Sequence, residues 1–511
     1  MTDWTSGYVT DIGYTFGYYT DLNPLRIRLA FLNDRLVCPE IGSACELGFG
    51  QGLSVNIHAA ASPARWYGTD FNPSHAGFAQ ELAFACGSEA RLFDQAFADF
   101  CCRTDLPDFD YIGLHGIWSW ISDENRGVIV DFIRRKLKVG GVLYISYNTL
   151  PGWAAFAPMR HLLTEHVEII GSEGYGILNC INGALEFADR LLATNPAYAR
   201  ANPNIAKRVQ SIKDKNRNYL AHEYFNRDWC PMHFSTLGDW LSSAKLSFAC
   251  SANPLDHVDG VNLTNDQRTF LKDITDPMFR ETVRDFMVNQ QFRRDYWVKG
   301  PRRLSPFEQG EELRRLRLIL ATPVADVTLK ASGAVGETAL MPQVYTPVLE
   351  ALADHQVHTL AEVERTVTTR NVSFPQLVQA LLVLAAKGDV ALAQDEAQVA
   401  TARGRTDRLN AYFLDKARGD GDLAYLASPV TGGGVSAGRF PQLFLLARSR
   451  GRQTPAEWAR FTWEIFSAQG QAVVKDGKRL QTPEENLAEL TARAQEFADK
   501  RLPILQALQI A

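Results

Sequence analysis

The chain has 511 residues, 46% of them hydrophobic and 22% charged, which is the composition of an ordinary globular protein. Its length predicts about three or four domains. Its formal net charge of −5 argues against a nucleic-acid-binding protein, whose binding surface would be basic.

Cellular location can also be predicted from composition. The first residues carry no basic segment followed by an apolar one, and no apolar run approaches the ~20 residues of a membrane span. The eight cysteines include no C-x-x-C pair. We therefore expect a cytoplasmic protein with reduced thiols, no bound metal such as zinc and no membrane attachment.

Residues 1–40 are rich in tyrosine and precede the first predicted strand. Four tyrosines lie here, namely Tyr8, Tyr14, Tyr18 and Tyr19. A turn at Asp21–Pro24 then begins a predicted helix, Leu25–Leu36, with leucines at helical spacing along one face. This aromatic segment either covers a binding site as a lid or packs against the sheet as an arm, and the two roles are compatible.

The most informative stretch is Ser43–Asn72. A short apolar run ends at Leu47, and glycines follow at alternate positions before a predicted helix; they are Gly48, Gly50 and Gly52. A second apolar run ends on Asp70. Glycine lets the backbone pass close to a ligand, and a carboxylate at the next strand end can bind the hydroxyls of a ribose. The stretch therefore predicts a nucleoside-binding site.

Strands and helices alternate up to Tyr147. The predicted strands are Arg65–Thr69, Ala90–Phe93, Phe109–His115 and Val142–Tyr147, and the predicted helices are Leu53–Ala61, Ser74–Ala85 and Asn125–Leu137. This alternation is typical of an α/β, doubly wound (Rossmann-like) fold, in which helices cover both faces of a mostly parallel sheet. Ligands bind such sheets beyond the carboxyl ends of the strands.

The alternation stops after this region. Residues 155–220 read as a helical insertion, and 221–231 look like a strand. A predicted helix, Ser235–Leu246, and a strand, Ser247–Ala252, then complete the first domain. We thus expect a core formed by 1–154 and 221–262.

The remaining chain is predicted to be mostly helical. We expect a middle domain at 263–335, with a break in the helices at Tyr296–Pro301, a winged-helix-like module at 336–400 and a helical region at 401–511. The third helix of the module, Phe374–Lys387, has a single basic residue, so the module is predicted to contact protein rather than DNA.

The glycine spacing narrows the choice of cofactor. The dinucleotide pattern G-x-G-x-x-G would need a third glycine where Leu53 stands, and the Lys-Ser/Thr of a P-loop is missing. Glu46-Leu-Gly-x-Gly-x-Gly, with an acid at the next strand end, instead resembles the first motifs of class I S-adenosylmethionine (AdoMet)-dependent methyltransferases.

This resemblance implies a set of cofactor-binding residues. The three glycines would line the methionine end, Asp70 would bind the ribose, and Asp99 would approach the adenine. The complete expected set is Tyr18, Glu46, Gly48, Gly50, Gly52, Asp70, Phe71, Ala98, Asp99 and His115.

Further segments extend the resemblance along the chain. They are His115–Trp120, Tyr147–Trp153, 222–226 and 292–297. Together they resemble bacterial methyltransferases with a methyltransferase regulatory domain, a group that includes the rickettsial lysine methyltransferases of outer-membrane proteins. Membership implies that the middle domain expected at 263–335 is the regulatory domain, and that it and the C-terminal domains contact a protein substrate, such as an outer-membrane protein. It also implies a homodimer formed through the helical insertion.

A lysine acceptor would set chemical requirements. Removing its proton at pH 7 costs about 4.6 kcal/mol, and a poorly hydrated aromatic channel lowers that cost. We expect Trp153 to line this channel together with Trp118, Trp120, Tyr147, Tyr18 and Tyr19. Asn148 would supply a carbonyl acceptor, and His115 or Tyr147, with Glu223, would relay the proton.

Each of these residues also has a structural interpretation. Trp120 and Trp153 can be core aromatics, His115 can simply contact the cofactor, and Glu223 can pair with Arg227. Two other functions stay open: a methyltransferase acting on a glycan or small metabolite, and a binding protein whose methyltransferase domain is inactive.

Overall fold

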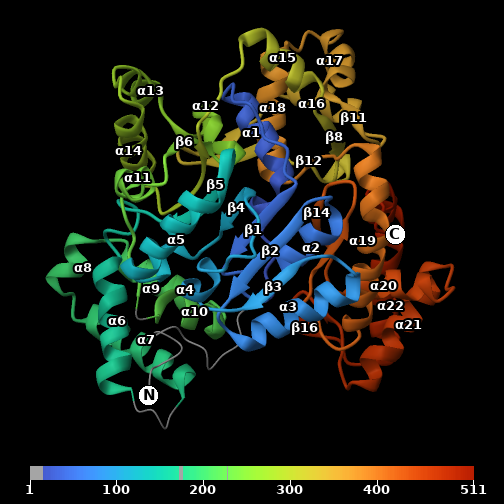
Figure 1. Ribbon diagram of the computed structural model, residues 1–511. Coiled ribbons are helices and arrows are strands. Elements are labelled where there is room, and N and C mark those ends of the chain that lie inside the picture. Colours follow the sequence, from blue (N-terminus) through green and yellow to red (C-terminus); the bar gives the residue numbers. More distant parts are fainter. Residues whose placement is uncertain (1–14, 172–175, 227) are drawn as a thin grey trace.

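A twisted seven-stranded sheet forms the centre of the computed structural model, which describes residues 15–171, 176–226 and 228–511 (Figure 1). The strand order is β3-β2-β1-β4-β5-β7-β6, and β7 runs antiparallel to both of its neighbours. The strands are β1 (Ser43–Leu47), β2 (Arg65–Asp70), β3 (Arg91–Asp94), β4 (Phe109–Leu114), β5 (Leu137–Asn148), β6 (Leu246–Ser251) and β7 (Phe292–Lys299). The doubly wound α/β prediction is confirmed.

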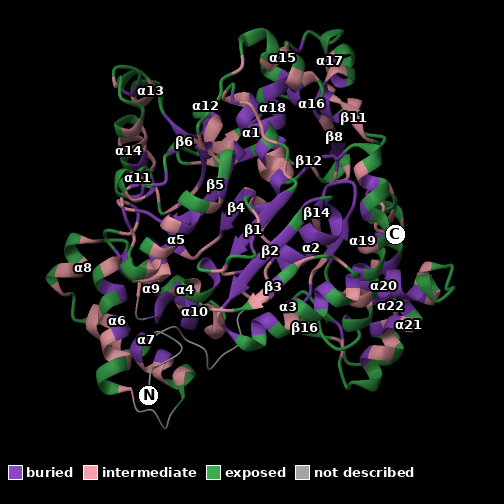
Figure 2. Cartoon of the chain, in the orientation of Figure 1, coloured by how far each residue is buried: buried purple, intermediate pink, exposed green. Residues whose placement is uncertain are grey.

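Helices cover both faces of this sheet. One face packs against α1 (Ile27–Asn33), α2 (Leu53–Ala61) and α3 (Pro73–Cys86). The other packs against α4 (Phe97–Cys101), α5 (Asp123–Lys136) and α11 (Phe234–Ser242). Figure 2 shows the strands as the buried centre of the molecule. This double cover explains why the residues of β1 are all buried.

The strand β7 corrects the prediction of a helical middle domain interrupted at Tyr296–Pro301. The sequence did not predict this strand because two of its buried positions hold polar residues, Arg293 and Asp295, where a strand usually has apolar ones. The two side chains bond to each other. Tyr296 and Trp297 fill opposite faces of the sheet. The sheet therefore extends well beyond residue 262, where we expected the core to end.

The helical insertion is confirmed as a compact cluster with its own apolar core. Its helices are α6 (Ala157–Ile170), α7 (Ile177–Ala193), α8 (Ala197–Ala201), α9 (Ile205–Lys213) and α10 (Arg217–Tyr224). The strand-like prediction at 221–231 is wrong at its start. The Asn216 side chain caps α10, and Leu220 and Tyr224 pack into the insertion core, so packing outweighs the β-propensity of the aromatic residues.

The region after β7 contains a small mixed module. Its sheet, in the order β11-β8-β12, takes β8 (Arg317–Leu320) from before the predicted start of the module at residue 336. The other elements after β7 are α15 (Pro306–Arg314), β9 (Lys330–Gly333), β10 (Gly336–Ala339), α16 (Pro342–Ala351), β11 (His358–Thr359), α17 (Leu360–Thr368), α18 (Phe374–Lys387) and β12 (Val390–Leu392). Between β6 and β7, the chain forms α12 (Asp259–Asn262), α13 (Asn265–Lys272) and α14 (Pro277–Val288).

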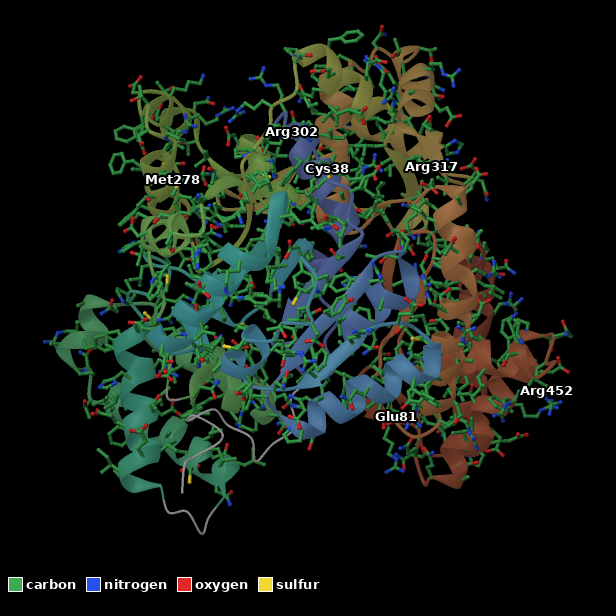
Figure 3. All side chains as sticks on the ribbon, viewed as in Figure 1. Cys38, Glu81, Met278, Arg302, Arg317 and Arg452 are labelled. Carbon is green, nitrogen blue, oxygen red and sulfur yellow. The ribbon has the colours of Figure 1, made fainter. Side chains whose placement is uncertain are left out.

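The C-terminal region packs onto the outer side of α2 and α3. On α3, Glu81, labelled in Figure 3, accepts a 2.6 Å hydrogen bond from Tyr412. The elements are α19 (Glu396–Lys416), β13 (Tyr425–Ser428), β14 (Gly433–Ser436), α20 (Arg439–Ser449), α21 (Pro455–Ala468), β15 (Val474–Lys475), β16 (Lys478–Arg479), α22 (Pro483–Glu496) and α23 (Leu502–Ala507). Short hairpins thus accompany the predicted helices. Among the described residues, no helix is both long and apolar enough to cross a membrane.

Candidate functional site

The turn after β1 requires glycine because of both its backbone conformation and the lack of space for side chains. Gly48, Gly50 and Gly52 all have positive φ, at 74°, 58° and 72°, a region that other residues rarely adopt. Space is also lacking, because a Cβ at Gly52 would lie 2.4 Å from the Ala79 Cβ. A Cβ at Gly48 would lie 2.5 Å from the side chain of Ile117. The turn therefore brings bare backbone to the carboxyl edge of the sheet.

The carboxylate of Asp70 fixes this turn to the end of β2. One oxygen accepts a 2.8 Å hydrogen bond from the Gly50 N–H, and the other accepts a 3.0 Å bond from the Asn72 N–H. The imidazole of His75 lies 3.3 Å from that second oxygen. Asp70 thus stands at the strand tip beside the turn, where a ribose-binding acid is expected.

A second carboxylate, Glu46, lies beneath the turn. Glu46 is 3% exposed, and its Oε2 has no hydrogen-bond partner among the residues that the structure describes. Burial, helped by the negative charge of Asp70, raises the pKa of Glu46 to about 8. An unpartnered carboxyl group next to a second acid suits a ligand that carries positive charge or N–H donors.

The remaining expected cofactor residues lie on the loops after β2 and β3. Phe71 follows Asp70 directly, and Ala98 and Asp99 lie exposed in the first turn of α4. Sequence reasoning missed Phe97 and Ile117, whose side chains both approach Gly48. Their positions directly after β3 and β4 were a usable signal, because loops at one sheet edge converge.

His115 lies at the end of β4 within a stack of rings. It stacks on Tyr19, with ring centroids 4.0 Å apart, and its Nδ1 lies 2.8 Å from the Tyr144 hydroxyl. Burial lowers the pKa of His115 to about 4. The imidazole is therefore neutral near pH 7 and too weakly basic to take a proton from an ammonium group.

Two predicted site residues point elsewhere. Tyr147 is 1% exposed and lies on the face of the sheet opposite to Tyr144, the hydroxyl partner of His115. It donates a 2.9 Å hydrogen bond to Asp295. Tyr18 packs between α2 and the β13–β14 hairpin, and its hydroxyl lies 3.1 Å from His58. These orientations do not support the predictions that Tyr147 lines a channel and that Tyr18 contacts the cofactor, because successive residues of an extended chain face opposite ways. Both roles stay predictions.

Asn148 is the last residue of β5, and Trp153 lies on the loop that follows it. Asn148 lies on the same face of β5 as Ser146, which is 3.5 Å from His115, and its own N–H donates to Ser119. Trp153 packs against Trp229, with ring centroids 5.1 Å apart. Asn148 therefore lies on the same side of the sheet as His115, whereas Trp153 packs against the edge of the insertion core.

The expected aromatic channel is instead a cluster of rings and arginines at that boundary. Its members are Trp120, Trp153, Trp229, Arg160 and Arg208, with the Arg208 guanidinium 4.4 Å from the centre of the Trp153 ring. Trp118 is not part of it, because that side chain is buried against Trp240.

Comparison with known proteins adds to this geometry. The chain is 40% identical over 513 residues to the uncharacterised protein sll1526 of Synechocystis sp., covering 99% of this chain and all of that protein. It belongs to the same family as sll1526. Over 320 residues it is also 25% identical to the uncharacterised protein RP789 of Rickettsia prowazekii, covering 60% of this chain and 56% of that protein.

The fold has a solved counterpart. The structure of PKMT2 from Rickettsia typhi, in complex with AdoHcy, matches 98% of this chain and all of its own chain, with a TM-score of 0.69 and 16% identity. Together with the strand order, this likeness shows the class I methyltransferase fold.

Residues 216–299 match the family described as "Predicted methyltransferase regulatory domain". This match corrects the position that we expected for that domain, 263–335. It runs from the start of α10 to the end of β7, so it includes the last two strands of the sheet. The regulatory segment is thus part of the same sheet as the glycine turn.

One cluster among the described residues could hold a metal ion, and it lies outside this site. It consists of Asp34, Cys250 and His257, whose ligand atoms lie within 4.8 Å of one another. The contacts of His257 are already explained by a 3.2 Å ion pair with Asp34 and a 2.8 Å hydrogen bond to the Ser251 carbonyl. The cluster therefore carries no metal assignment.

Proposed function

We propose that the protein is an AdoMet-dependent methyltransferase. The observation that carries this proposal is the glycine turn with positive φ at three alternate positions, flanked by the carboxylates of Glu46 and Asp70. The AdoHcy complex of PKMT2, a protein of the same fold, supports it. AdoHcy is what remains of AdoMet once its methyl group has been transferred.

The residues of the turn fit this cofactor. The Gly48–Gly52 backbone would hold the methionine end, and the unpartnered oxygen of Glu46 would accept hydrogen bonds from its ammonium group. Asp70 would bind the ribose hydroxyls, while Phe71, Ala98 and Asp99 would face the adenine. When bound, AdoMet supplies a methyl group activated on a sulfonium. The chain itself has to position the acceptor and exclude water.

Calorimetry tests the cofactor assignment. We expect AdoMet to bind the wild type, and Asp70→Ala to weaken binding by at least tenfold. Asp70→Asn, which keeps an acceptor for the Gly50 N–H, separates loss of the ribose contact from collapse of the turn. Asp94→Ala is the matched control, because Asp94 pairs with Asp70 in the sheet register but is exposed. Equal binding by all four proteins would disprove the assignment.

We propose lysine side chains of a protein as the methyl acceptors. The large helical and mixed modules around the sheet and the aromatic cluster at the insertion boundary support a macromolecular substrate. Mass spectrometry of candidate proteins, including an outer-membrane fraction, after incubation with AdoMet tests this step. Methylation confined to a glycan or small-metabolite fraction would favour the alternative acceptor.

We also propose that the insertion forms a homodimer. Its exposed apolar residues gather where α6 ends and α7 begins: Ile169, Ile170 and Leu178 are 76%, 65% and 41% exposed. Apolar side chains grouped in this way mark interaction surfaces. Light scattering gives the mass in solution, and a monomer at micromolar concentration would contradict this proposal.

A further inference from the structure

The helix α10 opens the regulatory segment and carries an acid that the site described so far does not use. Tyr219 and Glu223 lie four residues apart on this helix, so their side chains share one face. Both are partly exposed, whereas Leu220 and Tyr224 pack into the insertion core. Tyr219 also packs against the edge of that core, so the face that bears Glu223 lies at the margin of the core rather than inside it.

Tyr219 connects this face to the ring stack at the end of β4. The pKa of the Tyr219 phenol lies well above its usual value, mainly because the side chain is buried. Glu223, Tyr224 and Tyr19 also lie near enough to act on its charge. Tyr19 in turn stacks on His115. Figure 1 shows α10 in the lower part of the view, toward which the arrowheads of β1 and β2 point.

Glu223 itself differs from the other acids near the sheet. Its carboxylate makes no hydrogen bond or ion pair with any residue that the structure describes, and Arg227, its expected partner, lies outside the described residues. Asp295, by contrast, is held by Arg293 and Tyr147. Burial raises the pKa of Glu223 to about 7. A partly exposed acid with this pKa, and with no partner among the described residues, is suited to exchanging a proton near neutral pH.

The neighbouring titratable groups do not compete for this role. Tyr219 and Tyr224, on the same helix, remain protonated phenols, because burial raises the pKa of each. Arg208 on α9 acts on Tyr224. His115 is too weakly basic, and Tyr147 faces away, as described above.

We propose that Glu223 contacts the ε-ammonium group of the acceptor lysine and takes its proton before methyl transfer. This inference rests on the proposed lysine methyltransferase function. The ammonium N–H bond breaks and the proton goes to the Glu223 carboxylate, which leaves a neutral amine. The lone pair of that amine then forms the new N–C bond, while the electrons of the C–S bond stay on sulfur and give AdoHcy. The proton on Glu223 returns to solvent.

The test compares Glu223→Gln and Glu223→Asp with the wild type, using a methyl-lysine assay on an outer-membrane protein fraction. We expect Glu223→Gln to lower the transfer rate about 100-fold at pH 7, with unchanged AdoMet affinity by calorimetry. The wild-type rate should rise up to about pH 7 and then level off. The Gln variant should keep rising toward the pKa of free lysine. Glu223→Asp should recover part of the rate.

Controls keep the possible failures apart. Glu186→Gln changes an exposed glutamate on α7 that has no ion pair within the described part of the chain, and it should behave as the wild type. If the wild type methylates lysine and Glu223→Gln matches its rate and pH profile, the inference is wrong and the proposed function stands. If the wild type binds AdoMet but methylates no lysine, the proposed acceptor is wrong and the inference falls with it.

Discussion

The buried carboxyl group of Glu46 makes AdoMet binding depend on pH. With a pKa of about 8, Glu46 is roughly 90% protonated at pH 7 in the free protein. In the proposed complex, the ionised form of Glu46 pairs with the ammonium group of the cofactor, so binding would release this proton. We expect the AdoMet dissociation constant to fall about tenfold between pH 6 and pH 7, and about 0.9 proton to be released per AdoMet at pH 7.

The same group also affects folding stability. The folded-state pKa lies above the ordinary glutamate value of 4.5, so the folded protein binds more protons than the unfolded chain between those two pH values. The contribution of Glu46 to stability is therefore complete below pH 4.5 and is lost as the pH rises to about 8. The pKa difference corresponds to about 5 kcal/mol as an order of magnitude.

Glu46→Gln tests both effects because it keeps the size of the side chain and removes the titration. Calorimetry at pH 6 and pH 7, repeated in buffers of different ionisation enthalpy, gives the affinity and the proton count. Glu124→Gln, an exposed glutamate in the first turn of α5, is the control. If Glu46→Gln binds AdoMet with the wild-type pH dependence and proton release, the reasoning from the buried carboxyl group is refuted.

Two further substitutions test the turn and the sheet. Gly52→Ala should lower the free energy of unfolding by about 2 kcal/mol in urea denaturation and also abolish AdoMet binding, because the new methyl group meets Ala79 at positive φ. Gly77→Ala is the control: Gly77 has open space around it, so this variant should be slightly more stable than the wild type. An unchanged urea midpoint for Gly52→Ala would contradict this account. Tyr147→Phe should cost about 1–3 kcal/mol of stability by removing a buried donor to Asp295, with AdoMet affinity unchanged. A loss of methyl transfer without loss of stability would restore Tyr147 to the site.

The sequence by itself determined the parts of this protein that depend on local spacing. The helix predicted at Leu53–Ala61 has those bounds in the structure, and so does the helix Phe374–Lys387. The glycine turn and the acid at the end of β2 are also where the alternation put them. Such features follow from turn chemistry and apolar periodicity over a few residues, which neighbouring residues largely decide.

Only the tertiary structure decided which segments pair and which face a side chain occupies. The strand β7 joins the sheet because β5 and β6 supply partners for its backbone. Its buried Arg293 and Asp295 are stable there because they bond to each other and to partners on other elements, Asp285 and Glu281 for Arg293 and Tyr147 for Asp295. The neighbours Tyr18 and Tyr19 have almost the same local sequence context. One nevertheless packs under the C-terminal hairpin and the other stacks on His115. Long-range packing chooses between such alternatives, and local sequence does not encode that choice.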